Sequence, residues 1–205
     1  MALLPRVVFE DAQVIVVDKP SGLPSQGTRQ GSTPHVHGIL AEQRDYVGLH
    51  HRLDQPTSGL MVLTRDRRAN KALAEALQGG AVKRGYYAVV LGDPAVEGTW
   101  NASLDGRRAR THWRRLSEGA GMAVLEVRLE TGRTHQIRRH AADAGHPVIG
   151  DRRYGGAAGR LWPRLSLHAR RLSFPHPRTG ETVTLQAALP EDVRPLFSRA
   201  GLALD

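Results

Sequence analysis

Short apolar runs recur along this chain and end at polar or glycine-containing segments. Val14-Ile15-Val16-Val17 and Leu60-Met61-Val62-Leu63 are continuous apolar runs, which is typical of strands buried on both faces. The same reasoning predicts five further strands, at residues 86–91, 111–116, 123–129, 165–172 and 182–187. The hydrophobic pattern therefore predicts a β-sheet as the centre of the fold.

Helices are expected between these strands. Thr33-Pro34, an N-cap followed by proline, predicts a helix over about 34–44. Residues 66–78 are rich in Ala and Leu and are followed by two glycines, which predicts a second helix; residues 134–144 predict a third, and a short last helix is expected after Pro190. Successive strands with interspersed helices favour an α+β fold, with a mixed, largely antiparallel sheet and flanking helices, over a doubly wound fold.

Length, charge and composition narrow the class of protein. The 205 residues suit one substantial core, so we expect a single domain over 1–205. The formal net charge is +9, and only three of the 29 basic residues are lysine. Because guanidinium groups bind phosphate bidentately and stack on bases, this bias favours a nucleic-acid partner; a GC-rich genome that encodes basic residues as arginine is the alternative explanation. No stretch reaches transmembrane length and no signal peptide is evident, so we expect a cytoplasmic protein.

Several common catalytic signatures are absent from the sequence. Without cysteine there is no disulfide, thiolate nucleophile or cysteine-bound zinc. Neither Gly-x-x-x-x-Gly-Lys-Ser/Thr nor Gly-x-Gly-x-x-Gly occurs, which argues against nucleotide hydrolysis and nicotinamide chemistry. The ten histidines include no His-Glu-x-x-His, so we expect no metal. Thr57-Ser58-Gly59 lacks the first glycine of a serine-hydrolase elbow.

Asp54 is the leading candidate for catalysis. It lies in His51-Arg52-Leu53-Asp54-Gln55-Pro56-Thr57-Ser58-Gly59, where a turn-forming segment precedes an apolar strand. A short acid in such a loop can present its oxygens to a ligand; a turn aspartate bonded to its own backbone is the alternative. Glycosidases use two carboxylates, whereas this stretch offers one, which suits covalent or electrostatic catalysis better.

Two further groups of residues carry candidate chemistry. Residues 131–140 place polar and cationic side chains at the start of a helix, where free N–H groups favour a phosphate or carboxylate. Helical spacing puts His135 and Arg138 on one face; a solvated basic helix start is the alternative. Tyr86 and Tyr87 point to opposite faces of a predicted strand, so at most one of them faces a given site, and ordinary packing is the alternative for either.

Together these segments resemble the RluA family of pseudouridine synthases. The family's motif His-Arg-Leu-Asp-x-x-Thr-Ser-Gly is present at 51–59, and Gly-Arg-x-His-Gln-Ile/Leu-Arg is present at 132–138. Gly-His-Pro-x-x-Gly-Asp-x-x-Tyr-Gly is matched at 145–155, the early Lys-Pro-x-Gly loop at 19–22 and the late Leu-His-Ala strand at 167–169. The five motifs follow the family's order over nearly the whole chain, and we expect no N-terminal S4-like RNA-binding domain.

The resemblance implies one pseudouridine synthase catalytic domain with a central active-site cleft, and a reaction that needs no cofactor. It implies that Asp54 is the catalytic aspartate, that Tyr86 stacks on the uracil, and that Arg138 pairs with Asp54, since a charged carboxylate in a partly dry pocket needs a cation. The target nucleotide must be flipped out of its helix. Arg52 would then fill the space that the base leaves. The residues expected to contact substrate are Arg52, Leu53, Arg133, His135, Gln136 and Leu167.

We therefore expect an RNA pseudouridine synthase that isomerises uridine in structured tRNA or rRNA, as a monomer without metal or membrane contact. A non-catalytic RNA-binding protein on the same fold is one alternative. A glycosidic-bond hydrolase with Asp54 as nucleophile is another, and it would release free uracil. The target uridine stays open, as does the question whether Asp54 acts at ribose C1′, on the uracil ring or through a glycal.

Overall fold

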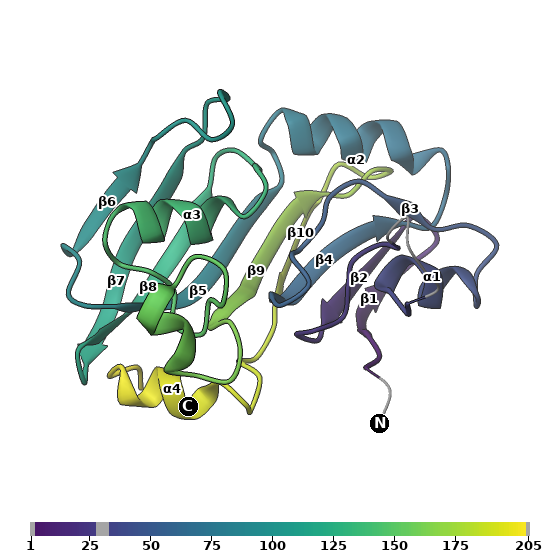
Figure 1. The fold of residues 1–205 in the computed structure, drawn as a ribbon. Helices are drawn as coiled ribbons and strands as arrows, with labels where there is room; N and C mark the ends of the chain where they lie inside the picture. The colour runs from purple at the N-terminus through teal and green to yellow at the C-terminus, as the bar shows by residue number, and fades with distance from the viewer. Residues whose placement is uncertain (1–2, 28–32, 204–205) are drawn as a thin grey trace. The chain divides into compact units, whose positions relative to one another are not determined.

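The structure is a computed structural model that describes residues 3–27 and 33–203 (Figure 1). The chain divides into two compact units, each built from two stretches of sequence. The first unit runs to Lys83 and includes Arg171–Ala187; the second consists of Arg84–Arg170 and the residues from Ala188 onward. The sequence predicts a single catalytic domain, and that stays a prediction.

The first unit is an antiparallel arrangement of short strands with two helices. Its elements are β1 (Arg6–Glu10), β2 (Val14–Lys19), α1 (Val36–Ala41), β3 (Gly48–Leu49), β4 (Ser58–Thr64), α2 (Ala69–Gln78), β10 (Thr182–Gln186) and the part of β9 (Leu167–Pro175) from Arg171 onward. β2 pairs with β1 on one side and with β4 on the other, β3 also pairs with β4, and β10 pairs with β9. The two apolar runs of the sequence are thus the neighbouring strands β2 and β4.

The core of the first unit joins its two stretches of chain. Side chains of β2 and β4 pack with Leu73 of α2 and with Leu172 and Phe174 of β9. All of these side chains are nearly inaccessible to solvent. Burial of this apolar surface is the main force that holds the unit together.

The second unit is a sheet covered by helices. Its elements are β5 (Lys83–Leu91), β6 (Glu97–Trp100), β7 (Thr111–Gly119), β8 (Met122–Leu129), α3 (Gln136–Asp143), a 3₁₀ helix η1 (Gly156–Arg160), the first part of β9, and α4 (Arg194–Arg199). The strand order is β9-β5-β8-β7-β6, and the pairs β5–β8, β8–β7 and β7–β6 are antiparallel. α3 packs over β7 (Figure 1). On a second side of the sheet, Leu196 and Phe197 of α4 pack with Val89 and Val124.

The structure corrects the predicted starts of the helices. α1 begins at Val36 because His35 has an extended backbone (φ −147°) and the Val36 N–H donates to the carbonyl of Pro24. α2 begins at Ala69, after the segment in which the Asp66 carboxylate accepts the N–H of Arg68. α3 begins at Gln136, two residues later than expected. No helix among the described residues is long and apolar enough to cross a membrane.

Candidate active site

The main chain around Asp54 is bonded to the segment that follows β2. We call residues 51–57 the Asp54 loop and residues 19–25 the anchor segment. The hydrogen bonds that join them include Ser25 Oγ to the Leu53 carbonyl (2.7 Å), the Leu53 N–H to Ser25 Oγ (3.1 Å), the Gly22 N–H to the Gln55 carbonyl (2.8 Å), Gln55 Nε2 to the Gly22 carbonyl (3.0 Å) and Ser21 Oγ to the Pro56 carbonyl (2.7 Å). Because the backbone is bonded on both sides of Asp54, the chain itself sets the position of this residue.

Lys19 strengthens this attachment from within the unit. Its side chain is fully buried, and Nζ donates to the carbonyls of Leu23 (2.7 Å), Gln55 (3.0 Å) and Pro20 (3.1 Å). A buried ammonium group is costly unless it is hydrogen-bonded, and three carbonyls give each of its N–H groups an acceptor. The lysine of the Lys-Pro-x-Gly motif therefore fixes the residue next to Asp54.

The Asp54 loop combines a turn with an accessible acid. The Asp54 carbonyl accepts the N–H of Thr57 (3.0 Å), so the turn that the sequence predicts is closed by main-chain atoms. Asp54 is half-buried and Arg52 is exposed, whereas Leu53 is buried. His51 Nε2 accepts the N–H of Val62 (3.1 Å), which ties the start of the loop to β4.

In the second unit, β5 separates the two tyrosines as alternation predicts. Tyr86 lies opposite Val127 of β8 and is buried, with 5 % of its surface exposed. Tyr87 belongs to the other face, where the guanidinium of Arg170 lies 5.9 Å from its ring centre. The two tyrosines therefore lie on opposite faces of β5 and in different surroundings.

Arg138 on α3 forms a buried, bidentate ion pair with Asp151. Nε donates to Oδ2 at 2.7 Å and Nη2 donates to Oδ1 at 2.8 Å. Oδ1 also accepts the N–H groups of Arg153 (3.0 Å) and Tyr154 (3.1 Å). Burial alone would raise the pKa of Asp151, but the hydrogen bonds from Arg138 and from these two N–H groups outweigh it and hold the pKa below its usual value.

The Asp151 carboxylate thus holds one edge of the Arg138 guanidinium. The resemblance implies that Arg138 pairs with Asp54, and this stays a prediction; the Nε–Nη2 edge of the guanidinium is bonded to Asp151. Sequence reasoning gave Asp151 no role, although the Gly-Asp-x-x-Tyr-Gly motif contained it.

Tyr154, from the same motif, contacts both His135 and Arg138. Its hydroxyl lies 2.9 Å from His135 Nδ1, the two rings meet edge to face, and the Arg138 guanidinium lies 5.1 Å from the Tyr154 ring centre. His135 precedes the helix and has a left-handed backbone (φ 53°), which is unusual for a residue with a side chain. The two residues are therefore brought together by Tyr154 and not by the helical spacing that the sequence suggested.

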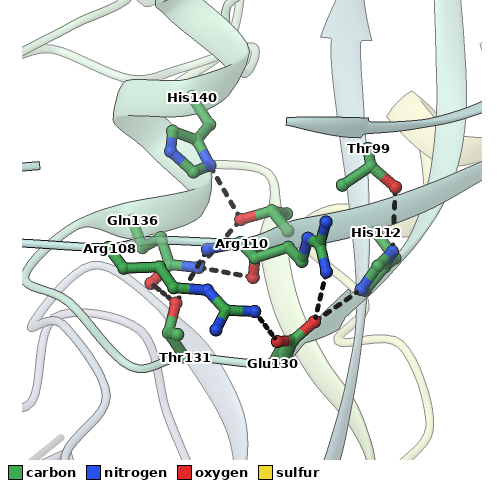
Figure 2. A network of polar contacts seen from close by, with 9 residues as sticks. Thr99, Arg108, Arg110, His112, Glu130, Thr131, Gln136 and His140 are labelled. Carbon is green, nitrogen blue, oxygen red and sulfur yellow. Dashed lines mark hydrogen bonds and ion pairs between the residues drawn. The ribbon is translucent and has the colours of Figure 1, made fainter. Parts of the chain in front are cut away.

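Gln136 and His140 attach α3 to the start of β7 (Figure 2). Gln136 Oε1 accepts from Thr131 Oγ1 (2.7 Å) and from the Arg133 N–H (3.0 Å), and Nε2 donates to the Arg110 carbonyl and Thr111 Oγ1, both at 2.9 Å. The amide thus has no hydrogen-bonding capacity left for the substrate contact that the sequence predicts. His140 Nε2 donates to the Ala102 carbonyl, so Nδ1 accepts from Thr111 Oγ1.

The other residues expected to contact substrate differ in their surroundings. Leu167, at the start of β9, is buried. Arg133 is half-buried, and its Nε donates to the Arg108 carbonyl (3.0 Å). In residues 3–27 and 33–203, no group of three or more His, Asp or Glu side chains could hold a metal ion.

Comparison with known proteins identifies the family. The family described as RNA pseudouridylate synthase matches residues 13–143. Ribosomal large subunit pseudouridine synthase D of Xanthomonas campestris pv. campestris is 38 % identical over 94 % of this chain and 68 % of that protein; its namesake in Nitrosomonas europaea is 36 % identical over 94 % and 64 %. The solved structure of human RNA pseudouridylate synthase domain containing 4 has 25 % identity and a TM-score of 0.79 over 97 % of this chain and 94 % of that one. The chain therefore belongs to the RNA pseudouridylate synthase family, which confirms the resemblance, the fold class and an isomerase acting on RNA.

Proposed function

We propose that this protein converts uridine in large-subunit ribosomal RNA to pseudouridine, with Asp54 as its one catalytic carboxylate. The observation that carries the proposal is the fixed main chain of the Asp54 loop, whose residues on both sides of Asp54 are bonded to the anchor segment. A carboxylate held by its backbone keeps one position when the substrate binds, and such pre-organisation is what catalysis by a single group requires. The ribosomal target follows the names of the two bacterial relatives; structured tRNA is the alternative.

The reaction rearranges bonds within one nucleotide. The N1–C1′ bond breaks, the detached uracil turns, a C5–C1′ bond forms, C5 loses its proton and N1 gains one. Atoms and electrons balance within the substrate, so we propose that the protein needs no cofactor or metal. We also propose that it acts as a monomer in the cytoplasm. Asp54 supplies the negative charge at the reacting centre, whether it acts at C1′, on the uracil ring or through a glycal.

Three other side chains complete the proposed site. Tyr86 stacks on the uracil and lies near the C5 proton, and Arg138, held by Asp151, pairs with Asp54. Arg52, exposed beside Asp54, enters the RNA helix as the nucleotide flips out. Unstacking the nucleotide costs a few kcal/mol, which contacts between arginines and phosphates offset.

Asp54→Asn tests the role of the carboxylate, because the amide has nearly the same shape without the charge. We expect tritium release from a C5-labelled large-subunit RNA transcript to fall at least about 10³-fold, as for the loss of a group that acts on the reacting bond. RNA binding, measured by filter retention, should stay close to that of the wild type.

The matched control is Asp45→Asn, an exposed aspartate in the same unit, which should leave the rate unchanged. Turnover by Asp54→Asn near the wild-type rate would contradict the assignment. Free uracil as a product would point to a hydrolase, and binding without tritium release by the wild type would point to a non-catalytic RNA-binding protein. Pseudouridine mapping in ribosomal RNA from a deletion strain would then identify the target.

A further inference from the structure

Arg84 lies on the same face of β5 as Tyr86. The two residues are two positions apart in one strand, so their side chains point to the same side, about 7 Å apart along the strand. Arg84 is half-buried, whereas Tyr86 is buried. A group bound by Arg84 would therefore lie close to one that stacks on Tyr86.

The guanidinium of Arg84 rests against the main chain at Gly132. A Cβ placed on Gly132 would lie 3.2 Å from Nη1 of Arg84 and 3.5 Å from Nη2. A side chain at 132 would thus make a tight contact with the charged end of Arg84, which would have to shift by a few tenths of an ångström. Glycine at this position of the Gly-Arg-x-His-Gln motif, which continues to Arg138 on α3, leaves the guanidinium where it is.

Arg84 differs from other cations of the second unit in having no carboxylate partner among the described residues. Arg108, Arg110 and His112 converge on the Glu130 carboxylate, as Figure 2 shows. In the described part of the chain, by contrast, no carboxylate forms an ion pair with Arg84, and its buried Nε has no hydrogen-bond partner. A guanidinium that is partly withdrawn from water and has no anion close by favours an anionic ligand at its accessible atoms.

We propose that Arg84 binds a backbone phosphate of the RNA, at the nucleotide that Tyr86 contacts or at its neighbour, and that Gly132 leaves the space this requires. The proposal rests on the proposed function, because it takes Tyr86 as a residue at the target nucleotide. A phosphate matches the two parallel N–H donors of a guanidinium. Arg84 then contributes to binding, while the chemistry belongs to Asp54.

Salt dependence of RNA binding is the direct test. Each lost phosphate contact lowers the slope of log K against log salt by about one. For Arg84→Ala and a large-subunit RNA transcript we expect a Kd raised about tenfold at moderate salt and a slope lowered by about one. The single-turnover rate of tritium release at saturating enzyme should stay within about twofold of the wild type, since only binding is affected.

Two variants serve as controls for this test. Arg178→Ala removes an exposed arginine in the β9–β10 turn and should change neither Kd nor slope. Arg84→Lys keeps the charge without the fork, so it should keep the slope and give an intermediate Kd. A wild-type slope for Arg84→Ala, with or without weaker binding, would overturn the proposal. A wild-type protein that binds RNA but releases no tritium would refute the proposed function, while the slope would still report on Arg84.

A double-mutant cycle tests the role of Gly132. Gly132→Ala should weaken RNA binding a few-fold by displacing the Arg84 guanidinium, and the same change in Arg84→Ala should have much less effect. Equal effects in both backgrounds would show that Gly132 acts independently of Arg84, and would overturn that half of the proposal.

Discussion

At the scale of single residues, the Arg138–Asp151 pair sets the position of the Arg138 guanidinium within the second unit. Both side chains are buried, and Asp151 uses its carboxylate for the pair as well as for the N–H groups of Arg153 and Tyr154. Gly155 belongs to the same arrangement, because a Cβ there would lie 2.4 Å from the Asp151 carbonyl oxygen. The guanidinium therefore has one orientation, which a flexible surface arginine would lack.

Asp151→Asn should reduce both stability and activity. Removing one charge of a buried ion pair leaves the other uncompensated and costs about 3–5 kcal/mol, which urea unfolding measures. The pKa of Asp151 is lowered in the folded protein, so its contribution is complete above the ordinary value of about 3.9 and is lost as pH falls through the folded value. The difference between wild type and variant should thus shrink below about pH 4.

The exposed pair Arg139–Asp105, one residue along α3, is the matched control. Asp105→Asn should leave the unfolding free energy and the rate of tritium release nearly unchanged, because exposed ion pairs contribute little. Equal losses for both variants would show that burial of the Arg138–Asp151 pair has no special role.

At the scale of elements, the anchor segment and the Asp54 loop form one rigid substructure, because hydrogen bonds join them. Lys19 stands at the end of β2 and Gly59 near the start of β4, and the two are partners in the strand register. The Asp54 loop is bonded to β4 at its start, through His51 and Val62, and leads directly into β4 at its end. Loops that emerge from a rigid sheet are a common way to hold functional groups.

Lys19→Met should weaken the attachment of the Asp54 loop to the anchor segment. Methionine keeps most of the length of lysine but leaves three carbonyls without their shared donor, so we expect a loss of about 2–3 kcal/mol in unfolding free energy. Displacement of Asp54 should lower the single-turnover rate about 10²-fold while the Kd for RNA changes little. Lys71→Met, at an exposed position of α2, is the control; a wild-type rate for Lys19→Met would show that the anchor is dispensable.

The sequence predicts some of these elements well and others poorly. β2 and β4 follow from continuous apolar runs because burial on both faces leaves only that pattern. β6 escapes prediction: its sequence Glu-Gly-Thr-Trp has no apolar run, and the Trp113 ring covers Gly98 from the neighbouring strand. The motifs point to Asp54 and Arg138 as site residues, which stays a prediction. The link from Arg138 to Asp151 spans 13 residues through a loop, which no periodicity reveals.

At the scale of the whole molecule, each unit is formed by two separate stretches of the chain. The stability of one stretch therefore depends on residues far away in the sequence. Phe174 is fully buried in the first unit, although the whole stretch Arg84–Arg170 of the second unit separates it from the N-terminal stretch of its own unit. Stability of the N-terminal strands therefore depends on residues near the C-terminus.

Phe174→Ala tests this dependence. We expect a loss of about 3–5 kcal/mol in unfolding free energy from the cavity it leaves. In native-state hydrogen exchange, amides of β2 should lose protection more than those of β8, because β8 belongs to the other unit. Leu161→Ala, at an exposed position, should change neither the unfolding free energy nor the protection of the β2 amides. Equal loss of protection in β2 and β8 would mean that the two units unfold together.

Because the chain re-enters the first unit only at Arg171, the order of synthesis decides when the core of that unit can be completed. Leu172 and Phe174 complete the core that β2 and β4 begin, yet the ribosome makes them only after the whole stretch Arg84–Arg170. At about 5–20 residues per second, the first strands wait roughly 5–20 s for their partners. During that interval we expect Val14-Ile15-Val16-Val17 to lack the part of its cover that β9 supplies, which makes it the segment most prone to aggregation while the chain is being made.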